Sequence, residues 1–212
     1  MKYQTFIALA FTLVTAISFT SCKKDNATTD NSAAIKNTLW VGDFNYTGSA
    51  VQPVSIQFNE GGNLGWYALS GDGSGSWTLN NNTITVTIAG GGFTASISGG
   101  NQLSNFKSTG NLNMVDAALN STTDESLDGT TWTAPNLVLK FKAGNKVDMY
   151  LGAAGSLPTY PNVDYTRKAK TVRFAASSVY KWFVVANSKT SYKGANSFDG
   201  DPNIYPFSMT KN

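Results

Sequence analysis

The feature that most constrains the fold is a series of short alternating segments separated by turn residues. In residues 83–88, isoleucine and valine alternate with threonine. A β-strand points successive side chains to opposite faces, so this alternation is typical of a strand with one buried face. Glycine and asparagine fill residues 61–63, 80–82 and 90–92, and such clusters favour chain reversal. The pattern predicts an all-β fold built as an antiparallel meander.

Part of this pattern occurs twice in the chain. Residues 37–40 (NTLW) recur as 129–132 (GTTW), and residues 77–86 recur as 165–174 with the same spacing between aromatic and strand positions. The order of motifs agrees although few residues are identical, which indicates an internal duplication. We expect residues 114–119 between the copies to form a short helix. The predicted parts are a leader, a tether, a first repeat, a linker and a second repeat, at residues 1–21, 22–36, 37–107, 108–128 and 129–212.

A meander needs its edge strands paired or covered, and closure into a barrel or packing of two sheets meets that need. The Thr-x-Trp opening, the Phe-x-x-Gly turns and the chain of hairpins resemble the lipocalin-like domains of secreted bacterial lipoproteins. The resemblance implies a lipocalin-like barrel or a two-sheet sandwich with an apolar pocket, and it carries no catalytic residue. The pattern leaves open whether the repeats form one barrel or two.

The N-terminal segment has the features of an export signal. Lys2 precedes an uncharged apolar run at residues 6–17, which is short for a membrane-spanning helix but suits a signal peptide. Cys22, the one cysteine of the chain, follows this run after four intervening residues. Residues 19–22 (FTSC) resemble the lipobox of bacterial lipoproteins, which implies cleavage before Cys22 and its acylation with fatty acid. The alternative is an ordinary signal peptide followed by a chance cysteine.

The resemblance also implies a location. An acylated Cys22 would anchor the chain to a membrane, since acyl chains partition into the bilayer. The polar residues that follow, within 22–36, favour a flexible tether. We therefore expect an outer-membrane lipoprotein that faces the periplasm or the cell surface.

Composition excludes several classes of function. The chain has no histidine, which removes the usual general base and the commonest metal ligand. Glutamate occurs only at positions 60 and 125, so a catalytic carboxylate pair is poorly supplied. The net charge of +3 is too small to indicate nucleic-acid binding. Residues 199–203 (DGDPN) could offer oxygens to calcium, but they lack the closing glutamate of a calcium loop and read as a turn. We expect no enzyme, cofactor or metal.

Charge is distributed unevenly between the two copies. Residues 37–106 contain three acidic residues and no lysine or arginine, whereas residues 130–212 contain eleven basic and four acidic residues. A basic second copy could face anionic lipid or an acidic glycan; the alternative is a set of solvated strand faces.

Aromatic residues supply the candidate ligand contacts. Trp66 lies in a strand-like segment and Tyr160 in a proline-flanked loop without a counterpart in the first copy. Each could contact a ligand, although tryptophans in strands commonly pack in cores and such a loop can be a rigid connection. We expect a non-enzymatic binding module for a small apolar ligand or a glycan. The alternative is a structural or protein-interaction lipoprotein of the envelope.

Overall fold

The computed structural model describes residues 35–122, 125–152 and 157–212. The predicted leader, Cys22 and the tether up to residue 34 lie outside the described residues. The described residues form sixteen β-strands and one turn of 3-10 helix, η1 (Glu60–Gly62). No helix in this part of the chain is long and apolar enough to cross a membrane. The all-β prediction is confirmed.

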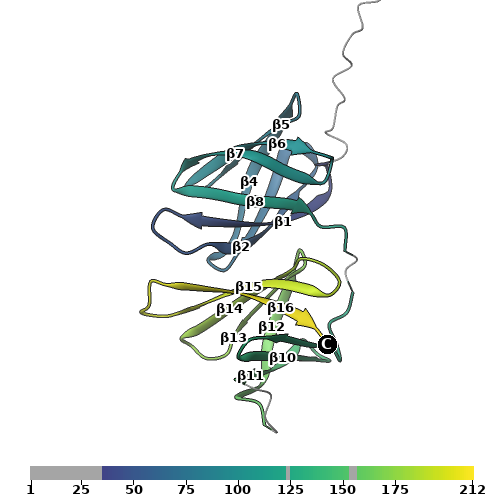
Figure 1. Ribbon diagram of the computed structural model, residues 1–212, viewed down its shortest axis with the longest axis vertical. Helices are drawn as coiled ribbons and strands as arrows, with labels where there is room; N and C mark the ends of the chain where they lie inside the picture. The colour runs from purple at the N-terminus through teal and green to yellow at the C-terminus, as the bar shows by residue number, and fades with distance from the viewer. Residues whose placement is uncertain (1–34, 123–124, 153–156) are drawn as a thin grey trace, which may run out of the picture.

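The first copy forms a closed antiparallel barrel of eight strands (Figure 1). Each strand pairs with the next along the chain, and the last pairs with the first, so none of the eight is left as an open edge. The strands are β1 (Thr38–Tyr46), β2 (Gln52–Phe58), β3 (Asn63–Ala68), β4 (Gly71–Asn80), β5 (Thr83–Ile88), β6 (Gly91–Ser98), β7 (Gln102–Gly110) and β8 (Leu112–Leu119).

The second copy repeats this architecture as a second closed barrel of eight strands. Here too the chain runs up and down, and the last strand pairs with the first. The strands are β9 (Thr131–Ala134), β10 (Leu137–Lys142), β11 (Lys146–Leu151), β12 (Tyr160–Lys168), β13 (Thr171–Ala175), β14 (Tyr180–Ala186), β15 (Ser191–Phe198) and β16 (Ile204–Lys211). The duplication is therefore confirmed, and it produces two barrels.

The start of each barrel shows how closely the copies agree. The indole Nε1 of Trp40 donates to Thr38 Oγ1 at 2.9 Å, and Trp132 donates to Thr130 Oγ1 at 3.0 Å. In turn, Thr38 donates to the Ile35 carbonyl, as Thr130 does to that of Leu127. The Thr-x-Trp motif thus satisfies the buried indole N–H through a threonine two residues earlier, which is a structural role for both tryptophans.

Strand register confirms the same alignment farther along the chain. Trp77 pairs with Val86 across β4 and β5, and its counterpart Tyr165 pairs with Phe174 across β12 and β13. The ring of Trp77 meets Phe58 edge to face at 5.6 Å, and that of Tyr165 meets the equivalent phenylalanine, Phe141, at 5.3 Å. The repeated spacing of aromatic residues in the sequence therefore reflects the same edge-to-face packing in both barrels.

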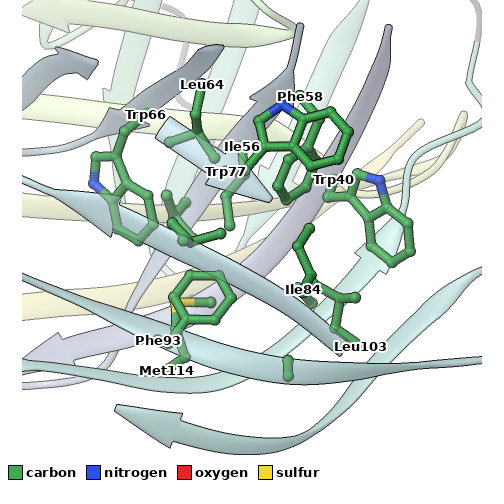
Figure 2. Packing of buried hydrophobic residues seen from close by; sticks show 14 of the residues in the cluster. Trp40, Ile56, Phe58, Leu64, Trp66, Trp77, Ile84, Phe93, Leu103 and Met114 are labelled. Carbon is green, nitrogen blue, oxygen red and sulfur yellow. The ribbon is translucent and has the colours of Figure 1, made fainter. Parts of the chain in front are cut away.

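Large side chains fill the interior of the first barrel (Figure 2). Trp40, Phe58 and Trp77 form one contiguous group of rings, and Trp66 lies apart from this group in Figure 2. A comparable cluster around Trp132 and Phe141 fills the second barrel. The protein's own side chains fill both barrel interiors. The barrels therefore differ from those that enclose a ligand in a hollow core.

Two predictions about the segment between the copies are wrong. Residues 108–119, assigned to the linker, lie mostly in β7 and β8, so the first barrel extends to Leu119. Residues 114–119, expected to be helical, form most of β8, which pairs with β1 and closes the barrel. This pairing overrides the helix propensity of a segment rich in alanine, methionine and leucine.

The two barrels pack against each other, with β2 in contact with β14, β15 and β16 (Figure 1). Along β14, Trp182 and Val184 point into the core of the second barrel. The alternate residues, Phe183 and Val185, point outward and are nevertheless fully buried, because they pack against Val41 of the first barrel. Each buried side chain of this size contributes roughly 1.5–3 kcal/mol. The outward face of β14 is thus an apolar contact surface between the barrels.

Candidate functional site

The candidate site is a hollow at one end of the first barrel, where β3 turns into β4 and β5 turns into β6. We call it the mouth. It has a volume of about 260 Å³ and is lined by Tyr46, Trp66, Ile88, Ala89 and residues 70–74. One side of the mouth is therefore aromatic and aliphatic, and the other is the polar, glycine-rich segment 70–74, which we call the glycine-rich wall. Both sequence-predicted contacts, Trp66 and Tyr160, lie among described residues, but only Trp66 lines this hollow.

Trp66, which lines the mouth, carries a buried hydrogen-bond donor without an acceptor among the described residues. Its side chain is 4% exposed, and its ring meets Phe44 edge to face at 5.0 Å. None of the described residues accepts a hydrogen bond from its indole Nε1, although the indole N–H groups of Trp40 and Trp77 are both satisfied. Trp182 in the second barrel also has an N–H without an acceptor among described residues, but that ring is stacked against Phe174. Trp66 differs because its donor belongs to a residue that lines a hollow.

A second polar atom near this end also lacks a partner among the described residues. Gln52 is 1% exposed, and its Oε1 receives no hydrogen bond from them. In β2 the alternation that places Val54 and Ile56 in the barrel core places Gln52 on the same inward face. A buried amide oxygen without a donor costs free energy unless something supplies one. This end of the barrel thus carries both an unsatisfied donor and an unsatisfied acceptor.

The cross-strand neighbour of Trp66 is a glycine, which places no side chain against its ring. Gly73 lies directly opposite Trp66 in the pairing of β3 with β4. In the second barrel the residue equivalent to Trp66 is Met149, and its partner across the strands is Tyr160. Tyr160 packs against the core there, 6.5 Å from the ring of Tyr180. The two predicted contact residues therefore lie in related places: the position that a tyrosine fills in the second barrel is left empty by glycine in the first.

The glycine-rich wall is a strand where the sequence indicated a turn. The composition of residues 71–73 (GDG) is typical of a turn, but these residues begin β4, and the chain reverses at residues 69–70. Tyr160, read as part of a loop, is likewise the first residue of β12. Pairing with the preceding strand imposes extended structure on both segments.

Acidic groups of the first barrel pair with basic groups of the second. Lys193 lies 2.6 Å from Asp43, and Asp72 of the glycine-rich wall accepts hydrogen bonds from Lys168, at 3.2 Å, and from Arg173. Partial burial alone would raise the pKa of Asp72, but the hydrogen bonds and positive charges of Arg173 and Lys168 outweigh it and lower the pKa. Some of the acidic groups of the first copy and the basic groups of the second therefore neutralise each other in ion pairs between the barrels.

The direction of the pKa shift fixes how this contact depends on pH. An unfolded aspartate titrates near 4, and the folded-state pKa of Asp72 lies below its usual value. The stabilisation from its ion pairs is therefore fully present above that unfolded value. It is lost as the pH falls through the lowered, folded-state pKa.

A second hollow lies between the barrels. It measures about 240 Å³, and Pro53 and Gln52 of the first barrel line it together with Phe207 of the second. Its charged groups, Asp43 and Lys193, pair with each other. We take the mouth as the candidate site because Trp66, Tyr46 and the glycine-rich wall line it together, whereas the charged groups of the second hollow pair with each other.

Of the remaining sequence candidates, the segment 199–203 lies among the described residues and Cys22 does not. The segment 199–203 forms the turn between β15 and β16, where Asp201 accepts hydrogen bonds from the Asn203 backbone N–H and from the Tyr205 hydroxyl. Among the described residues, no group of three or more potential metal ligands lies together. Cys22 lies outside them.

The uncovered position of Gly73 and the pairing between barrels were not identified from the sequence. The empty position at Gly73 follows from the register of β3 with β4. That register can be derived only if residues 71–73 are known to be extended. The signal for the pairing between barrels was the continuous apolar run at 182–186, which is typical of a strand buried on both faces. Comparison with known proteins adds no assignment: no family model matches the chain, and no curated protein matches it.

Proposed function

We propose that this chain is a lipid-anchored lipoprotein of the bacterial cell envelope whose lipocalin-like first barrel binds a glycan without catalysing a reaction. The observation that carries the proposal is the mouth, where Trp66, whose buried N–H has no acceptor among the described residues, lies beside a glycine-rich, polar wall. An apolar sugar face would pack against the ring of Trp66, and a hydroxyl oxygen at the edge of that ring would accept the hydrogen bond of its in-plane N–H.

A glycan fits the mouth better than a lipid or another fully apolar ligand. The barrel core is filled by side chains such as Phe58 and Phe93, so an acyl chain has no channel to enter. The mouth is open to the outside, and two serines and the glycine backbone of the wall line it beside the aromatic rings. Its volume is below the roughly 300–1,000 Å³ of sites for drug-sized ligands, which suits a single sugar residue of a longer chain.

The alternative, a protein-interaction lipoprotein, has less support from these features. Binding through a sheet edge requires an unpaired strand, and the sixteen described strands close into two barrels. Three cations of the basic second copy, Lys168, Arg173 and Lys193, already pair with aspartates of the first barrel, which reduces the positive charge that this copy offers to a partner.

Binding at the mouth is tested with Trp66→Phe. Isothermal titration with glucose, galactose, mannose, N-acetylglucosamine and their β-linked disaccharides measures the dissociation constant of each. Phenylalanine keeps an aromatic ring against Phe44 but removes the N–H, so we expect affinity to fall about 5-fold, which is the worth of one hydrogen bond.

The matched control for this test is Trp77→Phe. The indole of Trp77 donates to the Asn59 carbonyl at 3.0 Å inside the structure and does not line the mouth. We expect this variant to be less stable but to bind with wild-type affinity. If no sugar binds the wild type, or if both variants bind alike, the glycan proposal is wrong.

The anchor is tested separately with Cys22→Ala. A lipobox cysteine is the attachment point of the acyl chains, so we expect the variant to lose incorporation of a clickable palmitate analogue and to leave the membrane fraction. Ser21→Ala, which keeps a small residue before the cleavage site, is the control and should remain labelled. Equal labelling of Cys22→Ala and wild type would contradict lipid anchoring at this residue.

A further inference from the structure

The glycine-rich wall needs support from outside its own sheet. Residues 70–74 contain two glycines, which lack side chains to pack and weaken a strand. The charged residue of the wall, Asp72, points away from the mouth, since the residue opposite it, Tyr67, lies on the outer face of β3. The contacts that hold Asp72 are therefore made on the outer face of the barrel.

The second barrel supplies those contacts. Arg173 of β13 donates to Asp72 Oδ1 through Nη1 and to the Ala68 carbonyl through Nη2 at 2.6 Å. Its two donors thus hold the end of β3 and the start of β4 together, on either side of the turn at residues 69–70. Lys168 adds a hydrogen bond to Asp72 at 3.2 Å, and its ammonium lies 5.2 Å from the centre of the Tyr67 ring.

The guanidinium of Arg173 is itself held in place. It lies 5.2 Å from the ring of Phe183, which is fully buried between the barrels. The Arg173 side chain is 25% exposed, so its hydrogen bonds are less screened than those of a surface ion pair. Stacking on an aromatic ring restricts the fork geometry with which arginine recognises oxygens.

We infer that the second barrel acts as the positioning element of the mouth: Arg173, assisted by Lys168, fixes the glycine-rich wall through Asp72 and the Ala68 carbonyl. The inference rests on the proposed function, because it assigns the second barrel a role in ligand binding by the first. Arg173 and Lys168 are positioning residues in this scheme and do not line the mouth. In this scheme the two barrels have different roles: the first binds the ligand, and the second holds the glycine-rich wall in place.

The first measurement requires no ligand. Hydrogen–deuterium exchange of the amides at residues 70–75 is compared between wild type and Arg173→Met, which keeps an apolar stem but removes both donors. We expect exchange to be on the order of tenfold faster, since a charge-assisted hydrogen bond is worth about that factor in an opening equilibrium. The control is Lys181→Met, which removes the 3.0 Å surface pair with Asp199 within the second barrel. It should leave exchange at residues 70–75 unchanged.

The second measurement uses the sugar panel described for Trp66. We expect Arg173→Met to weaken binding several-fold, Arg173→Lys to recover part of the affinity, and Lys181→Met to bind like wild type. The milder variant Lys168→Met, whose side chain is 62% exposed, should shift both measurements in the same direction but less. It keeps the inference testable if Arg173→Met does not fold.

The outcomes separate this inference from the proposed function. A wild-type protein that binds no sugar removes the proposed function itself. A wild-type protein that binds, with Arg173→Met unchanged either in exchange at residues 70–75 or in affinity, overturns the positioning role alone. Faster exchange and weaker binding at unchanged melting temperature support it, because a merely structural role would lower the melting temperature without selecting the mouth.

Discussion

Replacing Trp40 with alanine is expected to lower the free energy of unfolding of the first barrel by about 3–5 kcal/mol. The side chain is fully buried, and its ring meets Phe58 edge to face with centroids 6.2 Å apart. Truncation leaves a cavity in the core and removes the hydrogen bond that Thr38 Oγ1 accepts from the Trp40 indole N–H. Urea unfolding followed by far-UV circular dichroism measures the loss without relying on tryptophan fluorescence.

The duplication provides the matched test for this prediction. Trp132→Ala removes the equivalent side chain from the second barrel, where the ring stacks on Tyr192 at 3.9 Å, and should cost a similar amount. The exposed Thr85→Ala on β5 is the control and should change stability by less than about 0.5 kcal/mol. A loss below about 1 kcal/mol in Trp40→Ala would contradict the assignment of Trp40 to a close-packed core.

The fold could be predicted from the sequence where aromatic and turn positions recur. Trp40 and Trp132 mark equivalent strand starts, and Trp77 and Tyr165 mark equivalent hairpins, because the same neighbours must be filled in each copy. Asn37 and Gly129, just before the first strand of each copy, both adopt positive φ, at 58° and 76°. Left-handed backbone restricts the residue types at such a position, and this restriction preserves turn positions after overall identity is lost.

The end of the first barrel could not be predicted in this way. Residues 114–119 contain good helix formers, and the inward positions Leu112, Met114 and Ala117 do not keep a strict period of two. The break coincides with a register shift in the pairing of β1 with β8, beside Asp43 and Phe44. A β-bulge of this kind depends on the partner strand, so the local sequence of β8 does not reveal it.

The candidate site was predictable in part. Trp66 was identified as a possible contact because aromatic rings stack on ligands, and it does line a hollow. What makes that hollow is the absence of a side chain at Gly73, and the support of its wall comes from Arg173, a hundred residues away in the sequence. Both depend on which strands and barrels are neighbours, which the alternation of residues does not specify.

Replacing Gly73 with tyrosine is expected to abolish sugar binding while leaving the barrel as stable as the wild type or more so. The substitution places in the first barrel the residue that the second barrel has at the equivalent position, Tyr160. A Cβ atom at Gly73 would lie 3.7 Å from Trp66 Cβ, which is an ordinary van der Waals contact, and Gly73 does not have a positive φ. The tyrosine ring would then cover the face of Trp66 and occupy the mouth.

Stability and binding should respond in opposite ways in this variant, which is what identifies Gly73 as a residue kept for a site. Tyrosine has a higher strand propensity than glycine on a scale that spans about 1 kcal/mol, so the melting temperature should not fall. Titration with the sugar panel should show at least a tenfold loss of affinity, because the ligand and the new ring compete for one volume. Ser76→Tyr is the control, since Ser76 lies exposed on the same strand, outside the mouth. Wild-type affinity in Gly73→Tyr would place any sugar site elsewhere on the molecule, whereas a large fall in melting temperature would show that the mouth has no room for the side chain.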